Sequence, residues 1–561
     1  MEKVWIKNYE PGVAGEVNVK ENKSIVELLE KIFSKFGPKP AISNFGKTIT
    51  YSELDYYSKR FASYLQNDLK LEKGARVAIM MPNLIQYPIA AFGALRAGMI
   101  VVNVNPLYTA KELEHQLNDS GAETIVIFSG AGHTLEAILS KTPVKNVILT
   151  NIGDMLPFPK SLLLNAAVKY IKKLVKDFNL PNATMFKDAL GKGNVDTYSR
   201  PQVESEDTAF LQYTGGTTGV SKGAVLTHSN ICANVAQAKA WIANGLEEGK
   251  EIVITPLPLY HIFSLTANMF TLSSVGAHNI FITNPRDFKG FVKELKKWKF
   301  TVFTGVNTLF NALINTEGFS ELDFSKFKLT LGGGMAVQKA VATEWKKVTG
   351  VTLIEAYGLT ETSPAACMNR LDLKEYNGFI GLPISNTEVA IKDDDENTLG
   401  FDENGEICIK GPQVMAGYWN RPEETAKVMT KDGYFKTGDI GFMNKDGYCK
   451  IVDRKKDMIL VSGFNVYPNE VEDAVITHEK ILEVAAVGVA DAKCGEVVKL
   501  FIVKKDPSLT EEEVVAHCKS VLTGYKRPKF IEFRDELPKS NVGKILRKDL
   551  RTPAPSPEAS V

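Results

Sequence analysis

A short stretch of the chain has the residue types needed to hold phosphate. Residues 213–223 read Tyr-Thr-Gly-Gly-Thr-Thr-Gly-Val-Ser-Lys-Gly, with four glycines, three threonines, one serine and one lysine. Glycine lets the backbone turn and approach a ligand closely, and the hydroxyl, N–H and lysine groups can bind phosphate oxygens. Such clusters are commonly plain turns, but the lysine favours phosphate binding. No Gly-Lys-Ser/Thr sequence closes the loop, so it is not a Walker A loop.

The segments beside this loop read as strands. Thr208–Tyr213 precedes it and Ala224–Thr227 follows it, which predicts strand–loop–strand rather than strand–loop–helix. In this setting the loop resembles the phosphate-binding signature of the adenylate-forming superfamily of acyl-CoA synthetases, amino-acid adenylation domains and firefly-type luciferases. The whole chain is most similar to bacterial long-chain fatty acyl-CoA ligases. The resemblance implies that the ATP-binding residues here are Tyr213, Thr214, Gly215, Gly216, Thr217, Thr218, Gly219 and Lys222.

A second signature, Ala-Tyr-Gly-Leu-Thr-Glu, occupies residues 356–361. Tyr357 can stack on adenine, and the Thr360 hydroxyl can bond a phosphate. Glu361 can hold Mg²⁺, a hard cation that prefers carboxylate oxygen. Glu361 is therefore predicted to be both a catalytic residue and a metal ligand, with Thr217 as the second metal-ligand candidate.

The ribose and adenine contacts are predicted from three further segments. Asp439 ends the sequence Tyr-Phe-Lys-Thr-Gly-Asp, and its carboxylate can accept protons from both ribose hydroxyls. The resemblance adds Arg454 as a second ribose contact. It also implies that the glycines after a predicted strand end border the adenine and the acyl pocket. These are Gly332, Gly333 and Gly334.

The segment Pro256–Leu265 is expected to line the acyl pocket by resemblance, with His261 near the substrate carboxylate and in a catalytic role. No acidic residue lies between Thr255 and Thr271. A buried ammonium group without a counter-charge is costly, so an α-amino acid is not the expected substrate. Acetyl-CoA synthetases have a tryptophan at the position that corresponds to Gly358 of this chain. The missing side chain of Gly358 leaves room for a longer acyl group. The predicted acyl-pocket residues are Tyr260, His261, Gly305, Val306, Gly334 and Gly358.

The C-terminal part of the chain is expected to form a mobile domain that carries further site residues. The charged sequence Asp-Arg-Lys-Lys-Asp-Met at residues 453–458 suits an exposed linker, and by resemblance it is a hinge with Lys456 at the pivot. Ser462, Gly463 and Phe464 resemble the wall of the CoA pantetheine tunnel. Lys544 lies in the motif that carries the family's catalytic lysine.

The composition describes a large, evenly charged globular protein. The chain has 561 residues, which is more than one hydrophobic core usually contains, so at least two domains are expected. Its net charge of +1 gives no global argument for nucleic-acid binding. Six cysteines are scattered without CxxC spacing, which indicates reduced thiols and a cytoplasmic location. The apolar stretch Ile89–Val104 is interrupted by Arg96 and is shorter than the roughly 20 residues of a spanning helix.

The elements that must position these residues follow an alternating pattern. Helix and strand periods alternate over residues 22–200, which predicts parallel sheets covered by helices. We expect an α/β fold with a large N-terminal domain, residues 1–453, that includes a small β-subdomain. A smaller, mobile α/β domain follows at residues 454–561, and its tail at 552–561 is expected to be disordered.

Residues 160–178 are predicted to form a basic amphipathic helix. Lys169, Lys172, Lys173 and Lys176 follow helical spacing on one face, and apolar residues occupy another. One alternative is an ordinary surface helix packed on the protein. The other is peripheral contact with an anionic membrane, which suits an enzyme whose substrate partitions into lipid.

The resulting hypothesis is ATP-dependent activation of a fatty acid as its CoA thioester, through an acyl-adenylate, with ATP, Mg²⁺ and CoA as cofactors or co-substrates. An adenylating ligase for an aromatic acid, or one that transfers the acyl group to a carrier protein, is the rival enzyme hypothesis. A lipid-binding or luciferase-like protein that makes no CoA ester is the alternative from another class. The expected partners are these small molecules, with a homodimer left open.

Overall fold

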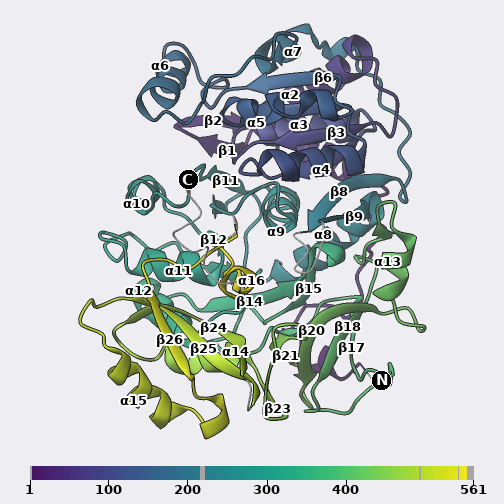
Figure 1. Ribbon diagram of the computed structural model, residues 1–561. Helices are drawn as coiled ribbons and strands as arrows, with labels where there is room; N and C mark the ends of the chain where they lie inside the picture. Colours follow the sequence, from purple (N-terminus) through teal and green to yellow (C-terminus); the bar gives the residue numbers. More distant parts are fainter. Residues whose placement is uncertain (1–2, 215–220, 492–493, 541–542, 552–561) are drawn as a thin grey trace.

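The computed structural model describes residues 3–214, 221–491, 494–540 and 543–551. These residues form four sheets, and the nine-stranded and eight-stranded sheets make up most of the large N-terminal part (Figure 1). The nine-stranded sheet has the order β16-β15-β14-β13-β12-β10-β11-β1-β2, and the eight-stranded sheet has the order β19-β9-β8-β4-β3-β5-β6-β7. A four-stranded sheet, β17-β18-β20-β21, is the predicted small β-subdomain, and β22–β26 form the C-terminal sheet.

The strands of the two large sheets have these bounds. The nine-stranded sheet contains β1 Pro40–Asn44, β2 Lys47–Thr50, β10 Ile252–Thr255, β11 His278–Phe281, β12 Val302–Gly305, β13 Leu329–Gly332, β14 Leu353–Gly358, β15 Ala365–Met368 and β16 Leu382–Pro383. The eight-stranded sheet contains β3 Arg76–Met80, β4 Ile100–Val104, β5 Thr124–Phe128, β6 Asn146–Thr150, β7 Thr184–Met185, β8 Thr208–Thr214, β9 Lys222–Thr227 and β19 Gly417–Tyr418.

The two smaller sheets come from the last third of the chain. Their strands are β17 Glu388–Lys392, β18 Gly405–Lys410, β20 Phe435–Met443, β21 Cys449–Arg454, β22 Ile459–Val461, β23 Phe464–Val466, β24 Ile481–Asp491, β25 Gly495–Lys504 and β26 Phe530–Arg534.

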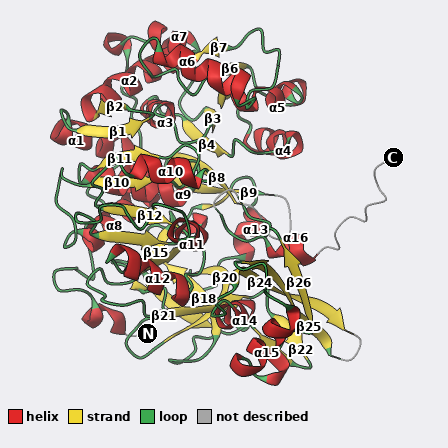
Figure 2. Cartoon of the chain, turned by 90° about the vertical axis from the view of Figure 1, so that its left-hand side faces the viewer, coloured by secondary structure: helices red, strands yellow, loops and turns green. Residues whose placement is uncertain are grey.

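The α-helices cover the sheets on their outer faces and fill the layer between the two large ones (Figure 2). They are α1 Ile25–Phe36, α2 Tyr51–Ser63, α3 Gln86–Arg96, α4 Ala110–Ser120, α5 Gly132–Glu136, α6 Lys160–Ala166, α7 Phe186–Lys192, α8 His228–Ile242, α9 Ile262–Ser264, α10 Phe288–Leu295, α11 Asn307–Ile314, α12 Lys339–Thr349, α13 Pro422–Lys427, α14 Pro468–Val475, α15 Glu511–Val521 and α16 Arg547–Arg551. Four 3₁₀ or π segments matter below: η5 Ala167–Ile171, η7 Leu265–Leu272, η8 Thr360–Thr362 and η9 Gly524–Lys526.

The parallel part of the eight-stranded sheet explains the alternation in the sequence. Strands β3, β4, β5, β6 and β7 run parallel, and β4 also pairs in parallel with β8. Along β3, Val77 and Ile79 join the core between the two large sheets, while Ala78 and Met80 join the core on the opposite face. Both faces are buried, as a parallel sheet requires. The predicted mixed α/β fold is therefore confirmed.

One predicted element is only partly right. The helix expected over residues 160–178 consists of α6 followed by the π-helical turn η5, and residues 172–178 are not helical. Lys173 has a left-handed φ of 53°, which ends helical geometry. Lys172, Lys173 and Lys176 thus follow the helix instead of sharing a face with Lys169. No helix among the described residues is long and apolar enough to cross a membrane.

The C-terminal sheet shares no strand pairing with the other three sheets over the described residues. It begins with Ile459, directly after the predicted hinge at 453–458. Hydrogen bonds from α11 of the large part, Thr308 Oγ1 to Gly543 O at 2.9 Å and Asn311 Nδ2 to Leu482 O at 3.0 Å, join the two units. The domain boundary at 453/454 stays a prediction, and the tail at 552–561 lies outside the described residues.

Candidate active site

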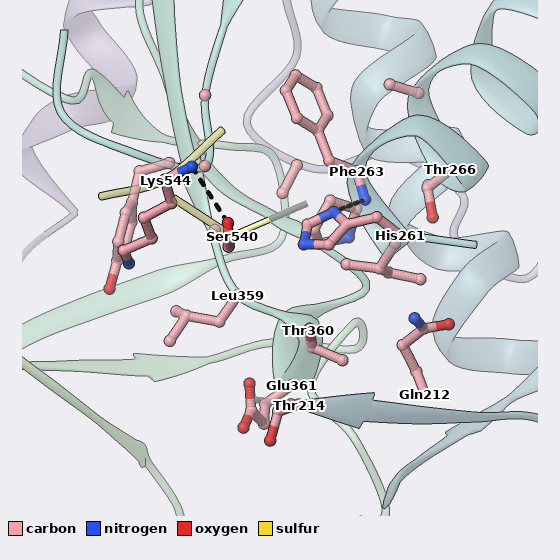
Figure 3. A pocket seen from close by; sticks show the side chains of 18 of the residues that line it. Gln212, Thr214, His261, Phe263, Thr266, Leu359, Thr360, Glu361, Ser540 and Lys544 are labelled. Atoms are coloured by element: carbon pink, nitrogen blue, oxygen red, sulfur yellow. Dashed lines mark hydrogen bonds between the residues drawn. The ribbon is translucent and has the colours of Figure 1, made fainter. Parts of the chain in front are cut away.

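A cavity of about 1020 Å³ is lined by both the large part and the C-terminal unit (Figure 3). It collects many of the residues that the sequence singled out, although they are up to several hundred positions apart. The predicted residues that line it are Tyr213, Thr214, Lys222, Tyr260, His261, Gly333, Gly334, Tyr357, Gly358, Thr360, Glu361, Arg454, Lys456 and Lys544.

The phosphate-loop candidate lies between two strands, as predicted, and these strands form a β-hairpin. Strands β8 and β9 pair antiparallel, with Thr214 opposite Lys222 at the end next to the loop. Tyr213 donates a 2.7 Å hydrogen bond to Asp119, which also accepts a 2.6 Å bond from Arg421, so the Tyr213 ring is fixed beside that end of the hairpin. Gly215, Gly216, Thr217, Thr218 and Gly219 lie outside the described residues.

An ion pair and an aromatic ring hold the end of the hairpin. Lys222 Nζ pairs with Glu424 of α13 and lies 5.2 Å from the ring centre of Tyr418. The Tyr418 hydroxyl in turn donates a 2.7 Å hydrogen bond to Glu361 Oε1. A cation on the hairpin and a carboxylate on η8 are thus connected through one side chain.

Glu361 is buried in η8, and burial raises the pKa of its carboxyl group above the usual range. A cation at this carboxylate would oppose that shift, because a nearby positive charge favours the ionised form. No group of three or more His, Cys, Asp or Glu side chains within the described ranges could enclose a metal ion by itself. The single buried carboxylate of Glu361, on the wall of the cavity, fits Mg²⁺ in its common protein setting, where one or two carboxylates and substrate phosphates share the ligation.

The candidate nucleoside contacts form a buried chain of three side chains. Tyr357, near the end of β14, donates a 2.7 Å hydrogen bond to Asp439 Oδ2, and Arg454 Nε lies 3.1 Å from Asp439 Oδ1. Burial, and next the Asp439 charge, hold the pKa of Tyr357 well above its usual value. Tyr357 and Arg454 line the cavity, whereas Asp439 stands behind them.

His261 is an uncharged residue in this site at neutral pH. Burial, assisted by the positive charge of Lys544, lowers the pKa of His261 to about 4. Its Nδ1 accepts a 3.3 Å hydrogen bond from the backbone N–H of Phe263, which caps the short helix α9. The ring therefore offers a neutral Nε2 group, suited to positioning a substrate rather than to transferring a proton.

Lys544 enters the cavity from the C-terminal unit (Figure 3). Ser540 fixes its loop in both directions: the Lys544 N–H donates to Ser540 Oγ at 3.1 Å, and the Ser540 N–H donates to Lys544 O at 2.7 Å. Burial, and next the charge of Arg454, lower the pKa of Lys544 to about 7. An anionic ligand in the cavity would restore the ammonium form.

The CoA-tunnel candidates lie elsewhere. Ser462 and Gly463 form the turn between β22 and β23, both with positive φ, and neither they nor Phe464 lines the cavity. Phe464 is 56% exposed and stacks on Tyr525 of η9 with ring centres 4.8 Å apart. In this arrangement Lys544 reaches the cavity while the predicted CoA segment faces away from it.

The predicted pivot residue also contributes to the cavity. Lys456 lines it, and Lys456 Nζ is buried without a hydrogen-bond partner in the described part of the chain. Burial, and next the charge of Arg454, lower the pKa of Lys456 to about 8. The Lys456 nitrogen has almost no accessible surface, so a ligand in the cavity does not reach it in this conformation.

Residues 29–419 match the family model for AMP-binding enzymes, and residues 470–544 match the model for the AMP-binding enzyme C-terminal domain. The chain belongs to the AMP-binding enzyme family. Curated proteins named long-chain-fatty-acid–CoA ligase from Yersinia pestis and Salmonella typhimurium are each 56% identical to it, covering 98% and 99% of both chains respectively. The solved structure of ATP-bound MatB from Rhodopseudomonas palustris is 27% identical, with a TM-score of 0.81, and covers 94% of this chain and 98% of its own.

Several glycines of this AMP-binding enzyme have packing roles that the sequence did not reveal. A Cβ atom on Gly358 would lie 1.8 Å from the carbonyl oxygen of Pro364, so the close approach of β15 requires glycine there, in addition to any effect on the acyl group. Gly305 and Gly332 would each meet a core side chain at 2.7 Å and do not line the cavity; nor does Val306. The acyl-pocket roles of Gly305 and Val306 and the ATP-binding role of Gly332 stay predictions.

The apolar half of the cavity in this AMP-binding enzyme comes mostly from residues that sequence reasoning missed. Helix α8, the π-helix η7 and strands β12 and β13 supply its walls. Helix α8 is apolar on more than one face, a signal that it is covered on two sides. Nothing local to the sequence indicates which of its residues face a cavity. The apolar lining includes Ala238, Ile242, Ala267, Leu272, Val302 and Leu329.

Proposed function

We propose that this AMP-binding enzyme is a long-chain fatty acid–CoA ligase. The observation that carries the proposal is the 56% identity, over nearly the full length of both chains, to curated proteins that bear this name. In the first step a fatty acid carboxylate attacks the α-phosphate of ATP, giving acyl-AMP and pyrophosphate. In the second step the CoA thiol attacks the acyl carbonyl, giving the thioester and AMP.

In the first step the protein positions the reactants and neutralises charge. The hairpin with Lys222 is assigned to the phosphates, and the chain Tyr357–Asp439–Arg454 is assigned to the nucleoside. Lys544 is assigned to the developing negative charge at the reacting carboxylate and phosphate. Mg²⁺, held by Glu361 together with the phosphates, would supply further charge neutralisation when bound.

The second step is assigned to another arrangement of the C-terminal domain. A rotation about Lys456 would withdraw Lys544 and bring residues 462–464 to the cavity, where they would border the pantetheine arm of CoA. Such a rotation lets one pocket serve two different transition states. The separation of Lys544 from the exposed Phe464 in this structure supports the assignment.

Product analysis with a series of acids tests the proposed function. Purified protein is incubated with ATP, Mg²⁺ and either a long-chain fatty acid or benzoate, with and without CoA, and pyrophosphate and thioester are measured. We expect pyrophosphate release with the fatty acid, increased by CoA, together with acyl-CoA. A preference for benzoate would support the aromatic-acid alternative. Pyrophosphate without any CoA ester would support a carrier protein as acceptor or a luciferase-like activity.

We also propose that the surface around α6 and η5 contacts anionic membranes. Ile171 is 77% exposed, and Phe158, Leu162, Leu163, Tyr170 and Leu174 also lie on the surface. Apolar side chains beside lysines suit the boundary between acyl chains and anionic head groups. Sedimentation with vesicles of phosphatidylglycerol is expected to carry the protein down at low salt and less at high salt.

A charge-reversal variant tests this surface. Lys169, Lys172, Lys173 and Lys176 changed together to glutamate should abolish vesicle binding while leaving the melting temperature nearly unchanged. Wild-type protein that stays in the supernatant with anionic vesicles would contradict the membrane assignment. We further propose that the enzyme is cytoplasmic and makes this contact peripherally. Whether it forms a homodimer is measured by size-exclusion chromatography with light scattering.

A further inference from the structure

One side chain of the large part makes a hydrogen bond directly beside Lys544. Thr308, in the first turn of α11, donates from its hydroxyl group to the carbonyl oxygen of Gly543 at 2.9 Å. Gly543 immediately precedes Lys544 in the C-terminal unit. The backbone position of Lys544 is therefore tied to the large part of the protein through this carbonyl group.

The backbone at Gly543 is shaped for this contact. Gly543 has a left-handed φ of 85°, a conformation that favours glycine. A Cβ atom at this position would lie 2.8 Å from Thr308 Oγ1 and 3.3 Å from Val306 Cγ2. The glycine before the lysine thus lets the loop approach the start of α11 closely enough for the hydrogen bond to form.

The other contacts of this loop lie within the C-terminal unit. The Gly543 N–H donates to Ser540 O at 2.9 Å, and the Lys544 N–H donates to Ser540 Oγ at 3.1 Å. These bonds fix the shape of the loop and would move with the C-terminal unit in a rotation. The Thr308 bond instead fixes where the loop lies relative to the large part. Because the Lys544 side chain is long and flexible, the position of its backbone determines where its ammonium group can reach.

The contact can also be broken without leaving a buried, unsatisfied hydroxyl group. Thr308 is only partly buried, and Met335 Sγ of the large part lies 4.0 Å from Thr308 Oγ1 as a weaker acceptor. A hydroxyl group has one proton to donate, and in this arrangement the Gly543 carbonyl is the nearer and stronger acceptor. After a rotation of the C-terminal unit, Met335 and solvent would remain as partners for Thr308.

We propose that Thr308 is a positioning residue for adenylation, which holds Lys544 at the cavity through Gly543 and releases it before thioester formation. Thr308 does not line the cavity, so it acts through Lys544 and not on the substrate. Loss of its hydroxyl group should therefore impair the first step and spare the second. This inference rests on the proposed function, because it assumes that Lys544 is needed in the first step alone.

Thr308→Val in the full-length protein tests the inference, because valine removes the hydroxyl group and keeps the side-chain shape. We expect the rate of ATP–pyrophosphate exchange with a long-chain fatty acid to fall about three- to tenfold, the effect of one lost hydrogen bond. Thioester formation from ready-made acyl-adenylate and CoA should be unchanged or faster. Thr308→Ser, which keeps the hydroxyl group, should exchange pyrophosphate at nearly the wild-type rate. In a Lys544→Ala background, Thr308→Val should cause no further loss, because the two residues act as a unit.

Thr316→Val is the matched control. Thr316 follows α11 and is also partly buried, but its hydroxyl group donates to Ala312 O at 2.7 Å, within the large part. Its loss should leave pyrophosphate exchange unchanged. Thermal melting checks that each variant is folded.

Amide hydrogen–deuterium exchange supplies a measurement that does not depend on turnover. The amides of Gly543 and Lys544 should exchange faster in Thr308→Val than in the wild type or Thr308→Ser. Any one of three results overturns the inference: wild-type pyrophosphate exchange in Thr308→Val, equal loss of both half-reactions in that variant, or unchanged amide exchange at these two residues. If wild-type protein shows no pyrophosphate exchange with any acid, it is the proposed function that fails.

Discussion

Binding of ATP should draw a proton from solution onto Lys544. In the structure the pKa of Lys544 is about 7, lowered from 10.5 mainly by burial and by Arg454. Free protein in this conformation therefore has a largely neutral Lys544 above pH 7. The negative phosphates of ATP favour the ammonium form and move the pKa back toward its ordinary value. At pH 8 the protonated fraction of Lys544 rises from about one tenth to nearly one, an uptake of about 0.9 proton.

Calorimetry can measure this uptake directly. A nonhydrolysable ATP analogue is titrated into the protein at pH 8 in two buffers with different ionisation enthalpies. The difference in observed heat gives the number of protons exchanged. Lys456, whose pKa is about 8, also lines the cavity and contributes up to about 0.5 proton. The decisive quantity is therefore the difference between wild-type protein and Lys544→Met, in which the cation is absent but much of the side-chain volume remains.

We expect the Lys544→Met variant to take up about 0.9 proton less than the wild type. As a consequence, ATP affinity in the wild type should fall as the pH rises above 7, because the proton required by the complex becomes scarcer. A difference below about 0.3 proton, or a proton release, would refute the claim that Lys544 is buried and neutral before ATP binds. Equal uptake in both proteins would assign the effect to another group.

Three further variants test other parts of the site. Glu424→Gln should lower the KM for ATP about two- to fivefold, because Lys222 loses a competing surface ion pair; an unchanged or higher KM would contradict that competition. Asp439→Ala should weaken ATP binding by about 1.5–3 kcal/mol, measured by calorimetry, and normal affinity with normal turnover would remove Asp439 from the nucleoside site. For Gly463→Leu, the added Cβ atom meets no atom within 4 Å, although the left-handed φ of 87° disfavours any side chain. Pyrophosphate exchange should therefore persist while thioester formation from ready-made acyl-adenylate falls at least tenfold. Lys544→Ala is the comparison and should lose pyrophosphate exchange while it still forms thioester from acyl-adenylate. Equal loss of both activities in either variant would argue against two conformations.

Sequence reasoning predicted the local elements well where the pattern itself determines the structure. The strands predicted on either side of the phosphate loop are observed as β8 and β9, and helices alternate with strands over residues 22–200. Long apolar runs bounded by turn residues leave few alternatives. The helix at 160–178 was predicted too long, because the π-turn η5 and the left-handed φ of Lys173 depend on local geometry that periodicity does not encode.

Only those residues of the candidate site that lie in short sequence motifs could be predicted. Tyr357, Glu361 and Lys544 were found from short signatures, and the structure brings them to one cavity. The links between motifs were not predictable, because the Tyr418–Glu361 hydrogen bond and the Lys222–Glu424 ion pair join segments that are far apart in the sequence. The acyl walls were missed for the same reason.

The strand order of the two large sheets also determines when their strands can pair during synthesis of the chain. Strand β1, at residues 40–44, pairs with β11, which begins at residue 278, and β9 pairs on its outer side with β19, at residues 417–418. Neither pairing can form on the ribosome until these distant segments have emerged. Until then β1 and β9 present unpaired edges, which are templates for association with other chains. The hairpin of β8 and β9 can join the eight-stranded sheet early, through β8 and β4, but both large sheets are completed only late in elongation.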